Sequence, residues 1–187
     1  MTTTARRFTI ADVMILIVAA ALATVLARDY FTSLYVVYKG KSVDRPIALA
    51  EGLSTCVASA ILLALIPIRL RRPRPGLRRL ARQPGFVASC AVAAALAAGV
   101  AQGLILISFR TWGYKRGPWP FQQLWAIGAE KCFFAIAGAW LLLALSGRWR
   151  AEPGWIDRLG RLMGAVWIFG ILVMFLETWI FRHLPAL

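Results

Sequence analysis

Residues 86–109 read FVASCAVAAALAAGVAQGLILISF, a stretch without a charged side chain. A helix needs about 20 consecutive, mainly apolar residues to cross a hydrocarbon core that is about 30 Å thick. Four other stretches meet the same requirement: 8–28, 47–68, 122–146 and 162–181. The sequence therefore predicts an all-α fold, a polytopic integral membrane helical bundle of five transmembrane helices that forms one transmembrane domain over residues 1–187.

Small side chains are concentrated in the 86–109 stretch. Alanine dominates residues 93–98, and Gly99 and Gly103 follow at the spacing that lets helix backbones approach closely in lipid. Gln102 lies beside this glycine pair, and we expect it to form an interhelical hydrogen bond. This helix is therefore predicted to lie in the middle of the bundle.

The composition is too apolar for an ordinary soluble domain. Hydrophobic residues make up 60% of the chain and the mean hydropathy is +0.68, whereas soluble domains contain about 45–50% apolar residues. The net charge of +14 would otherwise suggest a nucleic-acid partner. Its basic residues fall in short connections between apolar stretches, which is typical of membrane topology signals. We therefore predict that the chain binds no nucleic acid.

Lys and Arg are distributed unevenly between the two sets of connections. The N-terminus, 69–85 and 147–161 together hold 13 of them, whereas 28–46, 110–121 and 182–187 hold 8. Because basic loops remain in the cytoplasm, we expect a cytoplasmic N-terminus and an outer C-terminus. Arg outnumbers Lys by 18 to 4 and Asn is absent, which favours a GC-rich bacterial genome and therefore the bacterial inner membrane.

The start of the first span carries a capping signal. Thr9 followed by Asp12 resembles a capping box, in which the side chain of each residue accepts a hydrogen bond from the backbone N–H of the other. Asp12 is therefore expected to cap the helix rather than to carry protons. Although this first stretch resembles a cleavable signal peptide, we interpret it as a retained span.

Charged residues within the predicted spans are the candidates for chemistry, because each costs about 2.5–3.5 kcal/mol on insertion scales. Four of them fall in the outer half of the predicted bundle, Glu51, Glu130, Lys131 and Glu177, and Arg110 joins them at the outer end of the 86–109 stretch. They could bind a small ion or an anionic ligand, or pass protons along the three glutamates. The interpretation that we favour is that Arg110, Glu130, Lys131 and Glu177 pair with one another or with a neighbouring subunit, while Glu51 reaches interfacial water. Adjacent Glu130 and Lys131 point about 100° apart on a helix, so they cannot both face one narrow pore.

Arginines crowd into one cytoplasmic connection, with Pro73 and Pro75 preventing a continuous helix across it. Anionic lipid headgroups attract basic residues near a surface by about 1 kcal/mol each, and an acidic partner is an alternative. The simplest interpretation is that these arginines fix the orientation of the chain. The candidate contacts are Arg69, Arg71, Arg72, Arg74, Arg78, Arg79 and Arg82.

Aromatic residues mark two outer connections as candidates for partner docking. In 28–46, where the first helix could continue beyond the bilayer, they are Tyr30, Phe31, Tyr35 and Tyr38. In 110–121 they are Trp112 and Trp119. Aromatic residues are enriched both in the cores of protein interfaces and in the headgroup layer of membranes. Docking and an interfacial belt are both open interpretations.

Catalytic and cofactor-binding motifs are not evident in the sequence. The only His is His183, near the C-terminus, and Cys56, Cys90 and Cys132 lack the spacing of a metal site or a disulfide framework. There is no Gly-rich phosphate loop and no Ser/His/Asp set. We therefore predict that the chain is not an enzyme and binds no cofactor or metal.

The leading functional hypothesis is a small accessory or scaffolding subunit of a larger bacterial membrane protein complex. Its predicted partners are the lipid bilayer, anionic lipids and other membrane protein subunits. The alternative, from a different class, is a small membrane transporter or channel that uses Glu51, Glu130 and Glu177.

Overall fold

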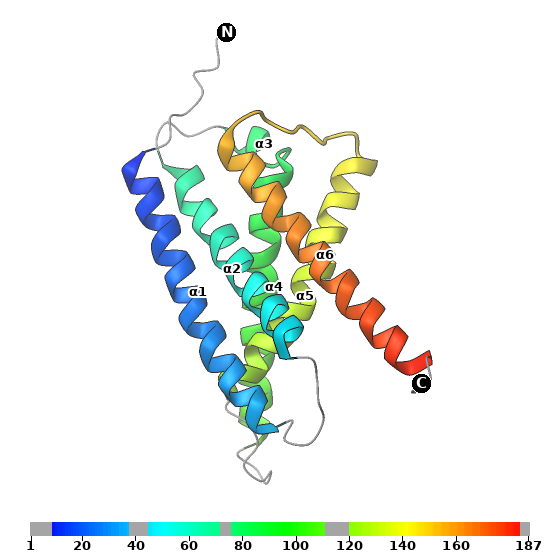
Figure 1. The fold of residues 1–187 in the computed structure, drawn as a ribbon. Coiled ribbons are helices and arrows are strands. Elements are labelled where there is room, and N and C mark those ends of the chain that lie inside the picture. The colour runs from blue at the N-terminus through cyan, green and yellow to red at the C-terminus, as the bar shows by residue number, and fades with distance from the viewer. Residues whose placement is uncertain (1–8, 38–44, 72–75, 111–119, 184–187) are drawn as a thin grey trace.

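The computed structural model describes residues 9–37, 45–71, 76–110 and 120–183, and over these residues the chain forms helices and no strand (Figure 1). The all-α prediction is confirmed. A short helix, α3 (Leu77–Leu80), precedes the third of the long helices. The long helices are α1 (Ile10–Val37), α2 (Arg45–Leu70), α4 (Pro84–Arg110), α5 (Pro120–Leu145) and α6 (Trp155–His183).

The long helices run alternately in opposite directions (Figure 1). The N-terminal ends of α1, α4 and α6 therefore lie at the same end of the bundle as the C-terminal ends of α2 and α5. Helix α4 contacts α2, α5 and α6, as expected for a helix inside the bundle, and α2 and α6 have equally central positions. Helix α1 packs mainly against α2, at the edge of the bundle.

All five long helices are longer than the spans predicted from hydropathy, and α1 and α6 exceed their predicted lengths most. Helix α1 continues to Val37, as expected for a first helix that extends into residues 28–46. Helix α6 begins at Trp155, before the predicted start at residue 162. Hydropathy misses this first part because it contains Asp157, Arg158 and Arg161, which are polar but lie in helical backbone.

The predicted capping box at the start of α1 is confirmed. The backbone N–H of Asp12 donates to Thr9 Oγ1 over 3.3 Å, and the backbone N–H of Thr9 donates to Asp12 Oδ2 over 3.2 Å. These bonds satisfy two N–H groups, one of them a first-turn donor that has no partner within the helix. The side chain of Asp12 is fully buried and also lies 3.9 Å from Arg71 Nη1 at the end of α2.

The core lies between α2, α4, α5 and α6. Each contributes fully buried apolar side chains, such as Leu62, Val92, Ile136 and Trp167. The indole of Trp167 donates to Ser59 Oγ over 3.1 Å, and this hydroxyl donates to the carbonyl of Thr55 over 2.8 Å. The indole N–H of the buried Trp167 therefore has a hydrogen-bond partner on α2.

Helix α5 ends in a glycine turn that directs the chain toward α6. Gly147 has a φ of 63°, in the left-handed region that a residue with a Cβ adopts reluctantly. The N–H groups of Gly147 and Arg148 donate to the carbonyls of Ala144 and Leu143, both over 3.1 Å, as in a Schellman motif. This turn sends residues 148–154 back across the end of the bundle.

Candidate functional site: an arginine–carboxylate cluster

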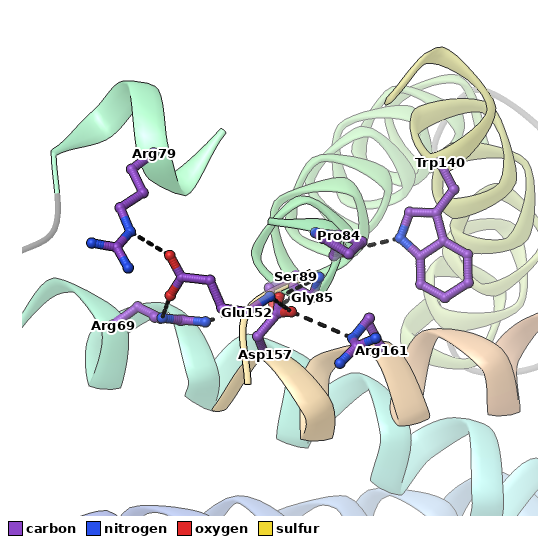
Figure 2. Close-up of polar contacts among 9 residues, drawn as sticks. All are labelled: Arg69, Arg79, Pro84, Gly85, Ser89, Trp140, Glu152, Asp157 and Arg161. Carbon is purple, nitrogen blue, oxygen red and sulfur yellow. Dashed lines mark hydrogen bonds and ion pairs between the residues drawn. The ribbon is translucent and has the colours of Figure 1, made fainter. Parts of the chain in front are cut away.

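Two carboxylates and three arginines meet at the end of the bundle where α2 ends and α4 and α6 begin (Figure 2). The carboxylates are Glu152, in the connection before α6, and Asp157, in the first turn of α6. The guanidinium groups come from three different elements, α2, α3 and α6: Arg69, Arg79 and Arg161. We call these five residues the arginine–carboxylate cluster.

Asp157 is the centre of this cluster, and its side chain is fully buried. Oδ1 accepts the backbone N–H of Gly85 and Oδ2 accepts the backbone N–H of Glu152, both over 3.0 Å. The carboxylate also lies 3.4 Å from Arg161 Nε and 3.9 Å from Arg69 Nη2. A buried carboxylate is tolerated only where charges and hydrogen bonds replace water, and this one has both.

Helix dipoles add to the stability of this arrangement. Asp157 lies in the first turn of its own helix and binds the N–H of Gly85, in the first turn of α4. Negative charge is favoured at both places because helix N-termini carry partial positive charge. Arg69 lies in the last turn of α2, where positive charge is favoured for the converse reason. One ion pair therefore complements three helix ends.

Glu152 extends the cluster toward the surface. Its Oε1 accepts a hydrogen bond from Arg79 Nε, and its Oε2 lies 3.9 Å from Arg69 Nη1. The side chain of Arg69 is 9% exposed, whereas that of Arg79 is 54% exposed. Glu152 therefore links a buried arginine of α2 to a surface arginine of α3.

The backbones of α4 and α6 touch directly beneath the cluster. A Cβ on Gly160 would lie 2.8 Å from Gly85 Cα, and a Cβ on Gly85 would lie 2.5 Å from the carbonyl oxygen of Asp157. Distances under 3.0 Å to backbone atoms leave no room for a side chain. This close approach brings the N–H of Gly85 within reach of Asp157, so the two glycines help to build the site.

Further bonds fix the start of α4 within this end of the bundle (Figure 2). The indole of Trp140 on α5 donates to the carbonyl of Pro84 over 2.9 Å, and Ser89 Oγ donates to the carbonyl of Gly85 over 3.1 Å. Proline suits the first position of a helix, where its missing N–H costs no hydrogen bond. The first turn of α4 is thus held by α5 on one side and by α6 on the other.

The contacts of the cluster join α2, α3, α4 and α6. Both oxygens of Asp157 accept backbone N–H groups, and the side chain has no exposed surface for a substrate. Glu152 lies between the guanidinium groups of Arg69 and Arg79. Among the described residues, no group of three or more His, Cys, Asp or Glu side chains is arranged to hold a metal ion.

The arginines predicted to contact lipid or a partner are divided by the structure. Arg69 is buried against Glu152 and Asp157, and Arg79 is bound to Glu152. Arg71, Arg78 and Arg82 are exposed at the same end of the bundle. Arg72 and Arg74 lie outside the described residues. The buried guanidinium of Arg69 braces the fold instead of facing a membrane surface.

Of the five residues in the predicted outer-half polar cluster, the structure describes the side chain of Lys131 alone. Lys131 Nζ on α5 donates a hydrogen bond to Gln102 Oε1 on α4, so the interhelical bond predicted for Gln102 is confirmed. The other four residues have helical backbones, but their side chains lie outside what the structure describes: Glu51, Arg110, Glu130 and Glu177. Their proposed convergence stays a prediction.

The aromatic docking candidates are described only in part. Tyr30, Phe31 and Tyr35 lie on the C-terminal part of α1, and their side chains are outside the described set. Tyr38, Trp112 and Trp119 lie outside the described residues altogether. Docking at these positions therefore stays a prediction.

Sequence reasoning missed the carboxylates of the cluster. Glu152 and Asp157 are the only acidic residues in 147–161, a connection that is otherwise basic. Carboxylates retained in such a connection are a signal for pairing with arginines, and this signal was available in the sequence. Gly85 and Gly160, in contrast, gave no local signal, because their close contact joins residues far apart in the chain.

Comparison with known proteins gives no further identification: no protein-family model, no curated protein and no solved structure matches this chain. Two helical stretches, Leu53–Leu70 and Pro84–Ile105, are long and apolar enough to cross a membrane within the described residues. Shorter apolar stretches are Ile10–Val25 and Lys131–Leu145.

Proposed function

We propose that the chain is a bacterial inner-membrane protein that crosses the bilayer five times, through α1, α2, α4, α5 and α6. The five helices contain 26 to 29 residues each, which corresponds to about 39–44 Å at 1.5 Å per residue. This length exceeds the hydrocarbon core of about 30 Å. Large apolar side chains exposed along α1, α4 and α6, such as Leu22, Ile105 and Phe175, support contact with lipid.

The proposed orientation puts the arginine–carboxylate cluster on the cytoplasmic side. The exposed arginines at this end of the bundle support it, since basic connections remain in the cytoplasm. Periplasm-active and cytoplasm-active reporters fused after residue 82, residue 115 and the C-terminus test it. We expect residue 82 to be cytoplasmic and the other two sites to be periplasmic. A cytoplasmic C-terminus would contradict the five-span topology.

Within the membrane, we propose that the chain is an accessory or scaffolding subunit of a larger membrane protein complex. The observation that carries this proposal is the bond between Lys131 and Gln102. Gln102 is exposed and Lys131 is partly exposed on the surface of the described chain. Lipid tails can contact the exposed apolar side chains, but they offer no hydrogen-bond acceptor to the ammonium group of Lys131.

The depth of this pair makes its exposure costly. Lys131 lies about 16 Å from the start of α5 at Pro120, and Gln102 lies about 12 Å from the end of α4 at Arg110, at 1.5 Å per residue. Both positions fall in the outer half of the proposed spans, within the hydrocarbon core of about 30 Å. An ammonium group has three donors, and Gln102 is its acceptor among the described residues. A polar residue on a transmembrane helix of a partner would supply the remaining acceptors.

Lys131→Leu tests the assembly role. The chain carrying a C-terminal tag is extracted from its native membrane in a mild detergent, and co-purifying proteins and particle mass are measured. We expect the unmodified chain to bring down stoichiometric membrane partners and Lys131→Leu to lose them. The melting temperature of the isolated chain should not fall, because the change removes a costly intramembrane charge.

Arg158→Leu is the matched control, because it removes one positive charge from an exposed residue of α6 outside the proposed contact. It should leave the particle intact. A purified chain that stays monomeric or homo-oligomeric would contradict the accessory-subunit proposal. If that lone chain transported a solute and Glu130→Gln abolished the flux without unfolding it, the transporter alternative would replace the proposal.

A further inference from the structure

An apolar groove of about 550 Å³ runs between α1 and α2. Its floor consists of small side chains from both helices, including Ala19, Ala23, Ser59, Ala60 and Ala64. Larger residues also line it, namely Met14, Val18, Leu22 and Leu63, and they are between 37% and 60% exposed. The groove is therefore open along its length to whatever surrounds the bundle.

The length of this groove matches one leaflet of a bilayer. From Met14 to Ala23 helix α1 rises about 14 Å, at 1.5 Å per residue, which is close to half of a hydrocarbon core of about 30 Å. A transmembrane helix of a partner would need a contact surface along both leaflets. The volume falls within the range of about 300–1,000 Å³ found for sites that hold small molecules. One acyl chain fits both dimensions better than a helix does.

An ion pair between Arg71 and Asp12 lies beyond one end of the groove. Met14 lies two residues beyond Asp12, and Asp12 Oδ1 lies 3.9 Å from Arg71 Nη1. Asp12 is already bound to the backbone N–H of Thr9, whereas the side chain of Arg71 is 50% exposed. The guanidinium group of Arg71 can therefore donate to a further anion without leaving Asp12. A phosphate group suits this donor, because guanidinium binds phosphate oxygens in a bidentate manner.

We propose that this groove binds one anionic phospholipid, with an acyl chain between α1 and α2 and the phosphate on Arg71. The charge beyond one end, the apolar lining and the single-leaflet length together favour this occupant over a neutral lipid or a protein helix. The inference rests on the membrane location proposed above and is independent of the assembly role. Such a lipid would fill the gap beside α1, which packs mainly on α2.

Native mass spectrometry of the purified, delipidated full chain tests the proposal. The probe is an equimolar mixture of phosphatidylglycerol and phosphatidylcholine with identical acyl chains. We expect one phosphatidylglycerol molecule to be retained in preference, and Arg71→Gln to reduce this preference about fivefold, the ratio for one basic residue near a lipid surface. Arg158→Gln, at an exposed residue of α6, should leave the preference unchanged.

Variants that fill the groove distinguish binding of the acyl chain from binding of the headgroup. Ala60→Phe should abolish retention of both lipids, and Leu63→Trp provides a second variant in case Ala60→Phe does not fold. Ala94→Phe, at an exposed residue of α4 outside the groove, is the matched control. Circular dichroism verifies the helix content of each variant. Glycerol phosphate without acyl chains should not displace the lipid, which distinguishes a lipid site from a free-anion site.

A photoreactive amino acid at position 18 identifies the occupant in the native membrane. Cross-linking to phospholipid is expected, and cross-linking to a protein instead would overturn the proposal. Equal retention of the two lipids by the unmodified chain, or retention by the Ala60→Phe variant, would also overturn it. Because these measurements use the isolated chain or its lipid contact, their failure leaves the Lys131 co-purification result unaffected.

Discussion

Replacing Asp157 by Ala is expected to lower the free energy of unfolding by about 3–5 kcal/mol, the loss found when one partner of a buried ion pair is removed. The change leaves the buried guanidinium of Arg69 without its neighbour at 3.9 Å and the N–H groups of Gly85 and Glu152 without their acceptor. For a chain of this size, the loss corresponds to a fall of about 10 °C in melting temperature. Thermal unfolding in detergent, followed by circular dichroism, measures it.

The double variant Asp157→Ala with Arg69→Met distinguishes pairing from simple packing. Removing both charges also removes the buried guanidinium that had lost one of its carboxylate neighbours, so the double variant should recover part of the stability that Asp157→Ala loses. Glu152→Gln is a milder control, because this side chain is 21% exposed and water can replace part of its interactions. If Asp157→Ala melted within a degree of the unmodified chain, the cluster would not brace the helices.

Replacing Gly160 by Leu is expected to have an effect of similar kind and of about 3 kcal/mol, the upper part of the usual range for overpacking. The new Cβ would lie 2.8 Å from both Gly85 Cα and its carbonyl oxygen, and backbone atoms cannot move aside as a flexible side chain can. Helices α4 and α6 would have to separate. The N–H of Gly85 would then move away from Asp157 Oδ1, so that packing and hydrogen bonding are lost together.

Gly138→Leu is the matched control for this prediction. Gly138 is also helical, but nothing lies within 4 Å of the position that its Cβ would take. It should leave the melting temperature unchanged or raise it slightly, since glycine is a poor helix former. Equal destabilisation by the two variants would mean that the loss does not come from the contact between α4 and α6.

Much of the local structure could be predicted from neighbouring residues. The capping box depends on Thr9 and Asp12, which are three positions apart, and the break after α2 follows from Pro73 and Pro75. The central position of α4 was indicated by its small residues, which permit close packing along much of its length. The sequence predicted that Gln102 forms an interhelical hydrogen bond, but it did not predict that Lys131 is the partner.

Of the arginine–carboxylate cluster, the sequence singled out arginines but neither carboxylate. Arg69 and Arg79 were singled out together with five other arginines, and nothing local distinguished the two that bind carboxylates. Their partners follow them by more than seventy residues in the chain, so that only the folded arrangement brings them together. Arg71 was likewise in the predicted set, but its partner Asp12 lies on α1, far from it in the chain.

The sequence by itself determined that this chain is helical, where its apolar helices lie and how the first one is capped, because these properties depend on residues within a few turns of one another. Only the tertiary structure decided which arginine meets which carboxylate, that Gly85 and Gly160 bring two backbones into contact, and that α1 and α2 leave a groove between them. These features depend on distances between helices, and such distances are set by the packing of the whole bundle rather than by any one segment.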